Sequence, residues 1–150
     1  MHSLFAVGAK LDVSQIVNQA MAESILDSKV KVTAPRNSQG GDGYYSKCNY
    51  YSAPPGKTLL LRVYRAAEGY YAQYEFDVVT QNTPSLKTVP GLGDKAMVTG
   101  GKASALPASS MMLYVLKGNV LLTVGLSGFD DENASLSKAR TVAEKILAQL

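Results

Sequence analysis

The 150-residue chain has little of what catalytic and metal sites are commonly built from, because it contains a single cysteine, Cys48, and a single histidine, His2. One cysteine cannot form an intramolecular disulfide. One cysteine and one histidine cannot supply the nitrogen and sulfur ligands of a usual zinc site. A Cys–His nucleophile pair would need His2 to fold back onto the strand predicted around Cys48. We therefore predict no catalytic residues, no metal site and no cofactor.

The sequence also lacks long apolar runs and a strong charge of either sign. No run approaches the roughly 20 apolar residues of a membrane-spanning helix, so no transmembrane segment is predicted. The short apolar run at 4–7 lacks the basic flank of a signal peptide, and residues 1–11 are expected to be a leader or a cloning remnant. The net charge of +3 is too small to indicate nucleic-acid binding by itself.

The composition, with 46% hydrophobic and 18% charged residues, is globular, and we expect residues 12–150 to form a single α+β domain. We predict a mostly antiparallel sheet of about six strands, flanked by N-terminal, central and C-terminal helices. The N-terminal and C-terminal helices are expected at 12–26 and 135–150, where apolar residues recur with the helical period. The strands are predicted at 29–34, 44–52, 57–65 and 96–99, together with the two of a central hairpin.

The central hairpin is predicted over Met111–Leu126. Two apolar segments meet at Gly118-Asn119, whose residue types tolerate the positive φ of a two-residue hairpin turn. Both segments are apolar at successive positions, which indicates central strands covered on both faces, or covered by a helix on one face and by a partner on the other. Three helices would leave part of a six-stranded sheet uncovered. We therefore expect a homodimer through an exposed sheet face or edge, or another protein partner.

Residues 66–81 fit two structures. Tyr70, Tyr74 and Val78 recur with the helical period, but Tyr70, Ala72, Tyr74 and Phe76 also alternate as in a strand. We favour the central helix, because a break follows at 80–89 and the segment opens with two alanines and a glutamate. The tyrosines and valines favour the strand.

Two short motifs invite functional interpretations that their surroundings do not support. Gly91-Leu92-Gly93-Asp94 lacks the third glycine and the strand–loop–helix context of a phosphate loop, and Asp94 would repel phosphate. We interpret it as a turn that needs positive φ, with the aspartate bonded to nearby backbone. Asp130-Asp131-Glu132 does not have the spacing of an EF-hand and is interpreted as the start of the last helix. Cys48 is predicted to be a buried core thiol.

One face of the sheet carries the candidate binding residues. Eight of the nine tyrosines lie between Tyr44 and Tyr74, and the segment 29–65 carries seven basic residues against one acid. If the strand at 44–52 pairs with the strand at 57–65, the alternation of strands places five aromatic and basic side chains on the same outward face. These candidate binding residues are Tyr45, Lys47, Tyr51, Arg62 and Tyr64. Such a face could be covered by a helix, could contact protein, or could bind nucleic acid or a small ligand.

Four segments carry a resemblance to a known group of proteins: Cys48-Asn49-Tyr50, Val89–Ala96, Leu113–Asn119 and Ala143–Leu150. Through them, most of residues 12–150 resembles small exported bacterial domains. These include lipoproteins and extracytoplasmic sensor domains of some actinobacterial kinases. The resemblance implies an antiparallel sheet flanked by helices, similar to the Mog1/PsbP-like arrangement, and a location in the cell envelope. It implies no catalytic residues. The paired cysteines of many of those domains are missing here, where Cys48 stands alone.

Taken together, these features indicate a non-enzymatic binding or protein-interaction domain, extracytoplasmic in the bacterial envelope. A cytoplasmic protein that binds single-stranded nucleic acid through the tyrosine and basic face is the alternative, and we favour a protein partner over nucleic acid. A small-ligand carrier is a third possibility and would need a cavity.

Overall fold

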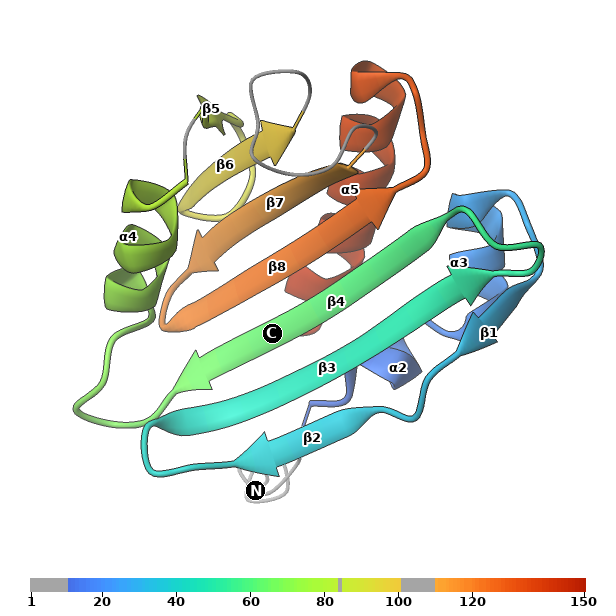
Figure 1. Ribbon diagram of the computed structural model, residues 1–150. Coiled ribbons are helices and arrows are strands. Elements are labelled where there is room, and N and C mark those ends of the chain that lie inside the picture. Colours follow the sequence, from blue (N-terminus) through green and yellow to red (C-terminus); the bar gives the residue numbers. More distant parts are fainter. Residues whose placement is uncertain (1–10, 84, 101–109) are drawn as a thin grey trace.

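The computed structural model describes residues 11–83, 85–100 and 110–150, and in them it shows an α+β fold with a single large antiparallel sheet (Figure 1). Eight strands form the sheet in the order β1-β3-β4-β8-β7-β6-β5, and β2 pairs with β3 on the same edge as β1. Their bounds are β1 Val30–Val32, β2 Arg36–Gln39, β3 Gly43–Ser52, β4 Thr58–Ala66, β5 Lys87–Thr88, β6 Lys95–Gly100, β7 Ser110–Lys117 and β8 Val120–Ser127.

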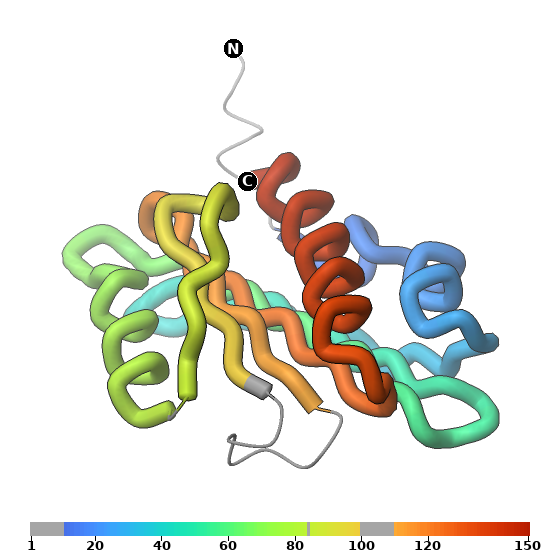
Figure 2. The backbone as a smooth tube through the Cα atoms, turned by 90° about the horizontal axis from the view of Figure 1, so that it is seen from above, coloured from blue at the N-terminus to red at the C-terminus, as the bar shows by residue number. Residues whose placement is uncertain are grey.

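The helices of the described residues lie on both faces of this sheet (Figures 1 and 2). The helices α2 (Val13–Ile16), α3 (Gln19–Leu26) and α5 (Glu132–Leu147) pack on one face, which we call the inner face. The helix α4 (Ala72–Gln81) packs alone on the opposite face, which we call the outer face. The predicted combination of N-terminal, central and C-terminal helices is therefore confirmed.

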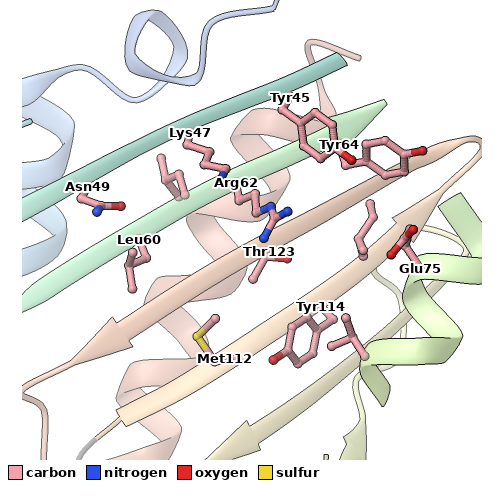
Figure 3. A pocket seen from close by; sticks show the side chains of 13 residues that line it. Tyr45, Lys47, Asn49, Leu60, Arg62, Tyr64, Glu75, Met112, Tyr114 and Thr123 are labelled. Atoms are coloured by element: carbon pink, nitrogen blue, oxygen red, sulfur yellow. The ribbon is translucent and has the colours of Figure 1, made fainter. Parts of the chain in front are cut away.

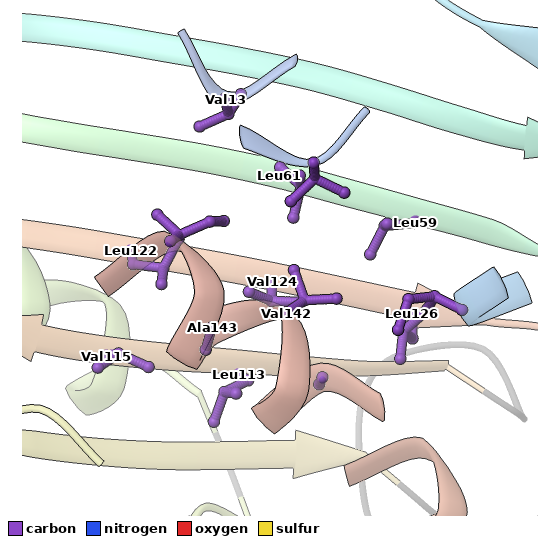
Figure 4. Packing of buried hydrophobic residues seen from close by; sticks show 14 of the residues in the cluster. Val13, Leu59, Leu61, Leu113, Val115, Leu122, Val124, Leu126, Val142 and Ala143 are labelled. Atoms are coloured by element: carbon purple, nitrogen blue, oxygen red, sulfur yellow. The ribbon is translucent and has the colours of Figure 1, made fainter. Parts of the chain in front are cut away.

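The main hydrophobic core lies between the inner face and its three helices (Figure 4). Alternate residues of the central strands supply the sheet side, and α5 and the N-terminal segment with α2 and α3 supply the helix side. Its fully buried members include Leu59, Leu61, Val63, Leu113, Val115, Leu122, Val124, Val142 and Ile146. Cys48 belongs to this core and is 2% exposed, so the prediction of a buried thiol is confirmed.

The central hairpin forms as the sequence predicts. β7 and β8 pair from Ser110–Ser127 to Lys117–Val120, which leaves Gly118 and Asn119 as a two-residue turn. Gly118 has φ +56°, whereas Asn119 is not among the described residues with positive φ. Positive φ at only the first turn position is the pattern of a type II′ turn.

The Gly91–Asp94 connector is the turn that the sequence predicts. Gly91 and Gly93 have φ values of +70° and +59°. The Asp94 carboxylate accepts a 2.7 Å hydrogen bond from the backbone N–H of Gly118. The connector is thereby tied to the turn of the central hairpin.

The structure corrects the predicted bounds of two helices and the predicted number of strands. Residues 12–26 form two helices, because Asn18 leaves the helical conformation and its side chain accepts a hydrogen bond from the Met21 N–H. The sheet has eight strands where about six were predicted, since β2 and β5 are short and polar and give no apolar alternation. The helix favoured at 66–81 starts only at Ala72, because β4 continues to Ala66. The leader expected at 1–11 falls almost entirely outside the described residues.

The helices α2 and α5 each have an aspartate as their N-cap residue. The Asp12 carboxylate accepts from the Ser14 N–H, so Asp12 is the N-cap of α2. The Asp131 carboxylate accepts from the backbone N–H groups of Asn133 and Ala134 at the start of α5. The acidic segment at 130–132 therefore starts the last helix, as its sequence indicates.

Candidate functional site

The outer face is organised in rows of side chains that run across the paired strands. The register pairs β3 with β4, β4 with β8, and β8 with β7, so each row takes one side chain from each strand. Three rows cross the centre of this face: Tyr45–Tyr64–Leu121–Leu116, Lys47–Arg62–Thr123–Tyr114 and Asn49–Leu60–Gly125–Met112.

Apart from Leu116 and Gly125, the residues of these rows line a groove of about 500 Å³ and form its floor (Figure 3). α4 covers only one side of the outer face, and it contributes Glu75 and Val79 to the groove. Arg62 and Leu60, on the central strand β4, remain exposed. The volume lies within the roughly 300–1,000 Å³ that is usual for small-molecule sites.

A pair of stacked tyrosines forms one end of the groove. The ring centroids of Tyr45 and Tyr64 are 4.8 Å apart, and the ring planes differ by 28°. Both hydroxyl groups donate to Asp42: Tyr45 to its carboxylate at 2.6 Å and Tyr64 to its backbone carbonyl at 2.7 Å. The guanidinium carbon of Arg62 lies 5.7 Å from the centre of the Tyr45 ring, within cation–π distance. Asp42 therefore fixes the rings, and Tyr45 in turn positions Arg62.

Among the residues that the structure describes, the two cations of the groove have no carboxylate partner. Lys47 and Arg62 occupy paired positions on β3 and β4, and Figure 3 shows Arg62 between Lys47 and Thr123. In residues 11–83, 85–100 and 110–150, the ion pairs are Lys138–Asp27 and Arg140–Glu144, both of which involve α5. Positive charge in the groove is therefore available to a ligand.

The turn of the central hairpin holds the α4 wall of the groove. The Asn119 side-chain oxygen accepts from the Ala72 N–H at 2.9 Å, at the start of α4. The Asn119 amide nitrogen donates to the carbonyl of Tyr70 at 3.0 Å. Below α4, Ala72 and Phe76 pack with Tyr64, Leu116 and Leu121 in a second, smaller apolar cluster. The position of Glu75 and Val79 over the floor follows from these contacts.

The five residues predicted from the sequence all lie on the outer face, and the structure brings four of them together. Tyr45, Lys47, Arg62 and Tyr64 line the groove. Tyr51 lies farther along β3, opposite Thr58, where its hydroxyl accepts from Asn49, and it does not line the groove.

The residues on the far side of the groove were not predicted from the sequence. Met112, Tyr114, Leu121 and Thr123 come from the central hairpin. The hairpin was predicted to be covered on both faces, or to be covered by a helix on one face and by a partner on the other. α4 covers only part of the hairpin, so these side chains remain in the groove floor. The signal in the sequence was the pair Tyr114 and Thr123, which interrupt the apolar run at positions that face each other across the hairpin.

The part of the chain that the structure describes lacks both the residue clusters of a metal site and the long apolar helices of a membrane span. It holds no group of three or more histidine, cysteine or acidic residues able to bind a metal ion. None of its helices combines the length and the apolar character that a membrane span requires.

Tyr45 is expected to keep its proton to strongly alkaline pH. The hydrogen bond to the Asp42 carboxylate, followed by burial, raises the pKa of Tyr45 from 10.0 to about 12. A folded-state pKa above the unfolded one stabilises the fold below pH 10, and this stabilisation is lost as the pH rises from about 10 through 12. In an absorbance titration of tyrosinate, Tyr45→Phe should remove the step near pH 12.

The control for this titration is Asp42→Asn, which keeps a side-chain acceptor but removes its charge. In this variant the Tyr45 step should move to lower pH. An unchanged titration curve in both variants would contradict the hydrogen bond between Tyr45 and Asp42.

Comparison with known proteins places the fold beside one solved structure. A scan against protein families finds no match, and neither does a search of curated proteins. The chain is similar to the extracellular domain of PknH from Mycobacterium tuberculosis, with a TM-score of 0.55 and 12% sequence identity. The similarity covers 90% of this chain and 94% of that domain.

At this identity the comparison shows a shared fold. It agrees with the predicted resemblance to sensor domains of actinobacterial kinases, at the level of fold. The likeness to Mog1/PsbP-like proteins stays a prediction, since no family matches.

Proposed function

We propose that this chain is a non-enzymatic binding domain of the bacterial cell envelope and that it takes its ligand into the groove of the outer face. The observation that carries this proposal is the groove itself: about 500 Å³ in volume, over the centre of the sheet, with aromatic, aliphatic and cationic side chains in its lining. A concave site with a mostly apolar lining and a few polar groups is typical of ligand binding.

The proposed location rests on the fold comparison. The PknH domain with the same fold is extracellular, and we extend that location to this chain. The proposal carries over neither signalling nor a connection to a kinase, because a shared fold does not imply a shared function.

Contact with protein through the outer face is the second candidate. Leu60, which is 39% exposed, lies beside Arg62 on β4, and Tyr51, which is 42% exposed, lies farther along the same face. Tyrosine and arginine are favoured at the centres of protein interfaces. A homodimer formed through this face would cover the groove.

Binding of single-stranded nucleic acid is disfavoured by the geometry of the tyrosines. Base stacking requires an accessible ring face. Tyr64 is only 4% exposed and stacks on Tyr45, so the pair offers no free face of Tyr64 to a base. Oligonucleotides are expected to bind weakly and without dependence on Tyr64.

The proposal is tested by filling the groove. Thr123→Trp places a large side chain in the middle row, between Arg62 and Tyr114. We expect amide resonances of groove residues in the wild type to shift when a mixed collection of small neutral, anionic and cationic compounds is added. These shifts should be lost in Thr123→Trp and retained in Thr141→Trp, an exposed control on α5.

Two results would overturn the proposal. One is that no compound shifts the groove residues. The other is a homodimer, detected by sedimentation of the wild type, that Thr123→Trp converts to monomer. That second result would make the outer face a protein interface.

A further inference from the structure

We infer that the ligand of the groove is a small amphiphile with a single carboxylate head and a flexible aliphatic chain. This inference rests on the proposed function and deepens it by naming the chemical class of the ligand. Three features of the groove carry it: the separation of charge from apolar surface along the rows, an arginine without a carboxylate partner among the described residues, and the net charge of the lining.

The rows of the outer face change character from one side of the groove to the other. On the β3 and β4 side, the middle row carries Lys47 and Arg62. On the β8 and β7 side it carries Thr123 and Tyr114, with Met112, Leu121 and the α4 residue Val79 around them. Neighbouring strands are about 4.8 Å apart, so the row runs roughly 10 Å from Arg62 to Tyr114. A ligand lying along the row meets cations at one end and apolar surface at the other.

Arg62 is placed to bind the head. Its guanidinium has no carboxylate partner among the described residues and is held near the Tyr45 ring. A guanidinium offers two parallel N–H donors, which match the two oxygens of a carboxylate. Lys47 lies opposite Arg62 on the next strand and adds a second positive charge.

The charge of the lining selects a monoanion. Lys47 and Arg62 contribute two positive charges, and Glu75 contributes one negative charge from α4. A head with one negative charge balances the remaining positive charge, whereas a phosphate dianion would exceed it. A carboxylate therefore fits this groove better than a phosphate does.

The apolar side is continuous and adaptable. Gly125 lies between Leu60 and Met112 in its row. A Cβ on Gly125 would come within 2.8 Å of the Met112 sulfur and 3.2 Å of the Leu60 Cβ. The absence of a Cβ at Gly125 leaves room for both side chains over the sheet, and methionine adapts its shape to an apolar chain. Burial raises the pKa of Tyr114 above its usual value, so this phenol stays uncharged.

The test measures binding of decanoate by calorimetry, together with four comparison ligands. These ligands are acetate, decanol, decyltrimethylammonium and a short acidic peptide. We expect decanoate to bind most tightly and to shift groove resonances. Decanol should bind roughly tenfold or more weakly, since it lacks the charge that pairs with Arg62.

Variants then test which groove residues bind the carboxylate head and which bind the aliphatic chain. Arg62→Gln should weaken decanoate roughly ten- to hundredfold without lowering the melting temperature. Lys145→Gln removes an exposed cation on α5, at the inner face, and should leave affinity unchanged. Leu60→Ala should weaken decanoate and leave the weaker binding of acetate unaltered.

The outcomes separate this inference from the proposed function. If decanol or decyltrimethylammonium binds in the groove as tightly as decanoate, the carboxylate head is wrong, and the proposed function stands. If the acidic peptide binds more tightly, the amphiphile is wrong and the groove is a peptide site. If no ligand of any charge shifts groove resonances, the proposed function itself fails.

Discussion

Replacing Gly93 by valine should lower the free energy of unfolding by about 2–5 kcal/mol, combining the cost of a left-handed backbone with that of overpacking. Gly93 has φ +59°, a conformation that side chains with a Cβ rarely adopt. A Cβ at this position would also lie 2.6 Å from the Val115 Cγ1 atom and 2.7 Å from the Leu116 carbonyl oxygen. The clash cannot be relieved by a flexible side chain alone, because the carbonyl belongs to the backbone of β7.

The same substitution at Gly118 is the matched control. Gly118 has nearly the same φ, +56°, but a Cβ there would have no atom within 4 Å. Gly118→Val should therefore cost roughly 1–2 kcal/mol, the conformational part alone. Urea denaturation of the two variants measures the difference. Equal losses would show that the contact of Gly93 with β7 contributes nothing.

The second large effect concerns two neighbouring leucines of β4. Leu59 is fully buried in the main core, and Leu59→Ala should lower the free energy of unfolding by about 2–5 kcal/mol, because it leaves a cavity. Leu60, the next residue, faces the groove and is 39% exposed. Leu60→Ala should change stability by no more than about 0.5 kcal/mol.

This pair also tests the division of β4 into an inner and an outer face. A substantial stability loss for Leu60→Ala, comparable to that for Leu59→Ala, would mean that the outer face is covered in solution. A homodimer formed through that face would give such a loss, and its dependence on protein concentration would identify it.

Sequence reasoning reached the centre of the fold because the signals there are local. Strict alternation in β3 and β4 places Tyr50 and Leu61 inside, and a glycine-containing pair marks the hairpin turn. The edge strand β2 gives no such signal. All four of its residues are exposed, so its polar sequence looks the same as a loop.

The candidate site could be predicted only on one side. Alternation and strand pairing were enough to group Tyr45, Lys47, Arg62 and Tyr64 on one face. The other side depends on where α4 lies, and this is decided by long-range contacts. Asn119 bonds to the backbone at Ala72, 47 residues away in the sequence. No short segment of the sequence therefore indicates how much of the outer face α4 leaves uncovered.

The groove and the main core lie on opposite faces of the same strands, and this arrangement has an evolutionary consequence. Along β4, every second side chain packs in the main core, and the ones between them, such as Leu60 and Arg62, line the groove. Substitutions in one set leave the other set in place, because neighbouring side chains of a strand point to opposite sides. A lineage can therefore exchange one ligand for another by point mutations without passing through unfolded intermediates. Proteins that share this fold at low sequence identity, such as the 12% between this chain and the PknH domain, need not bind the same compounds.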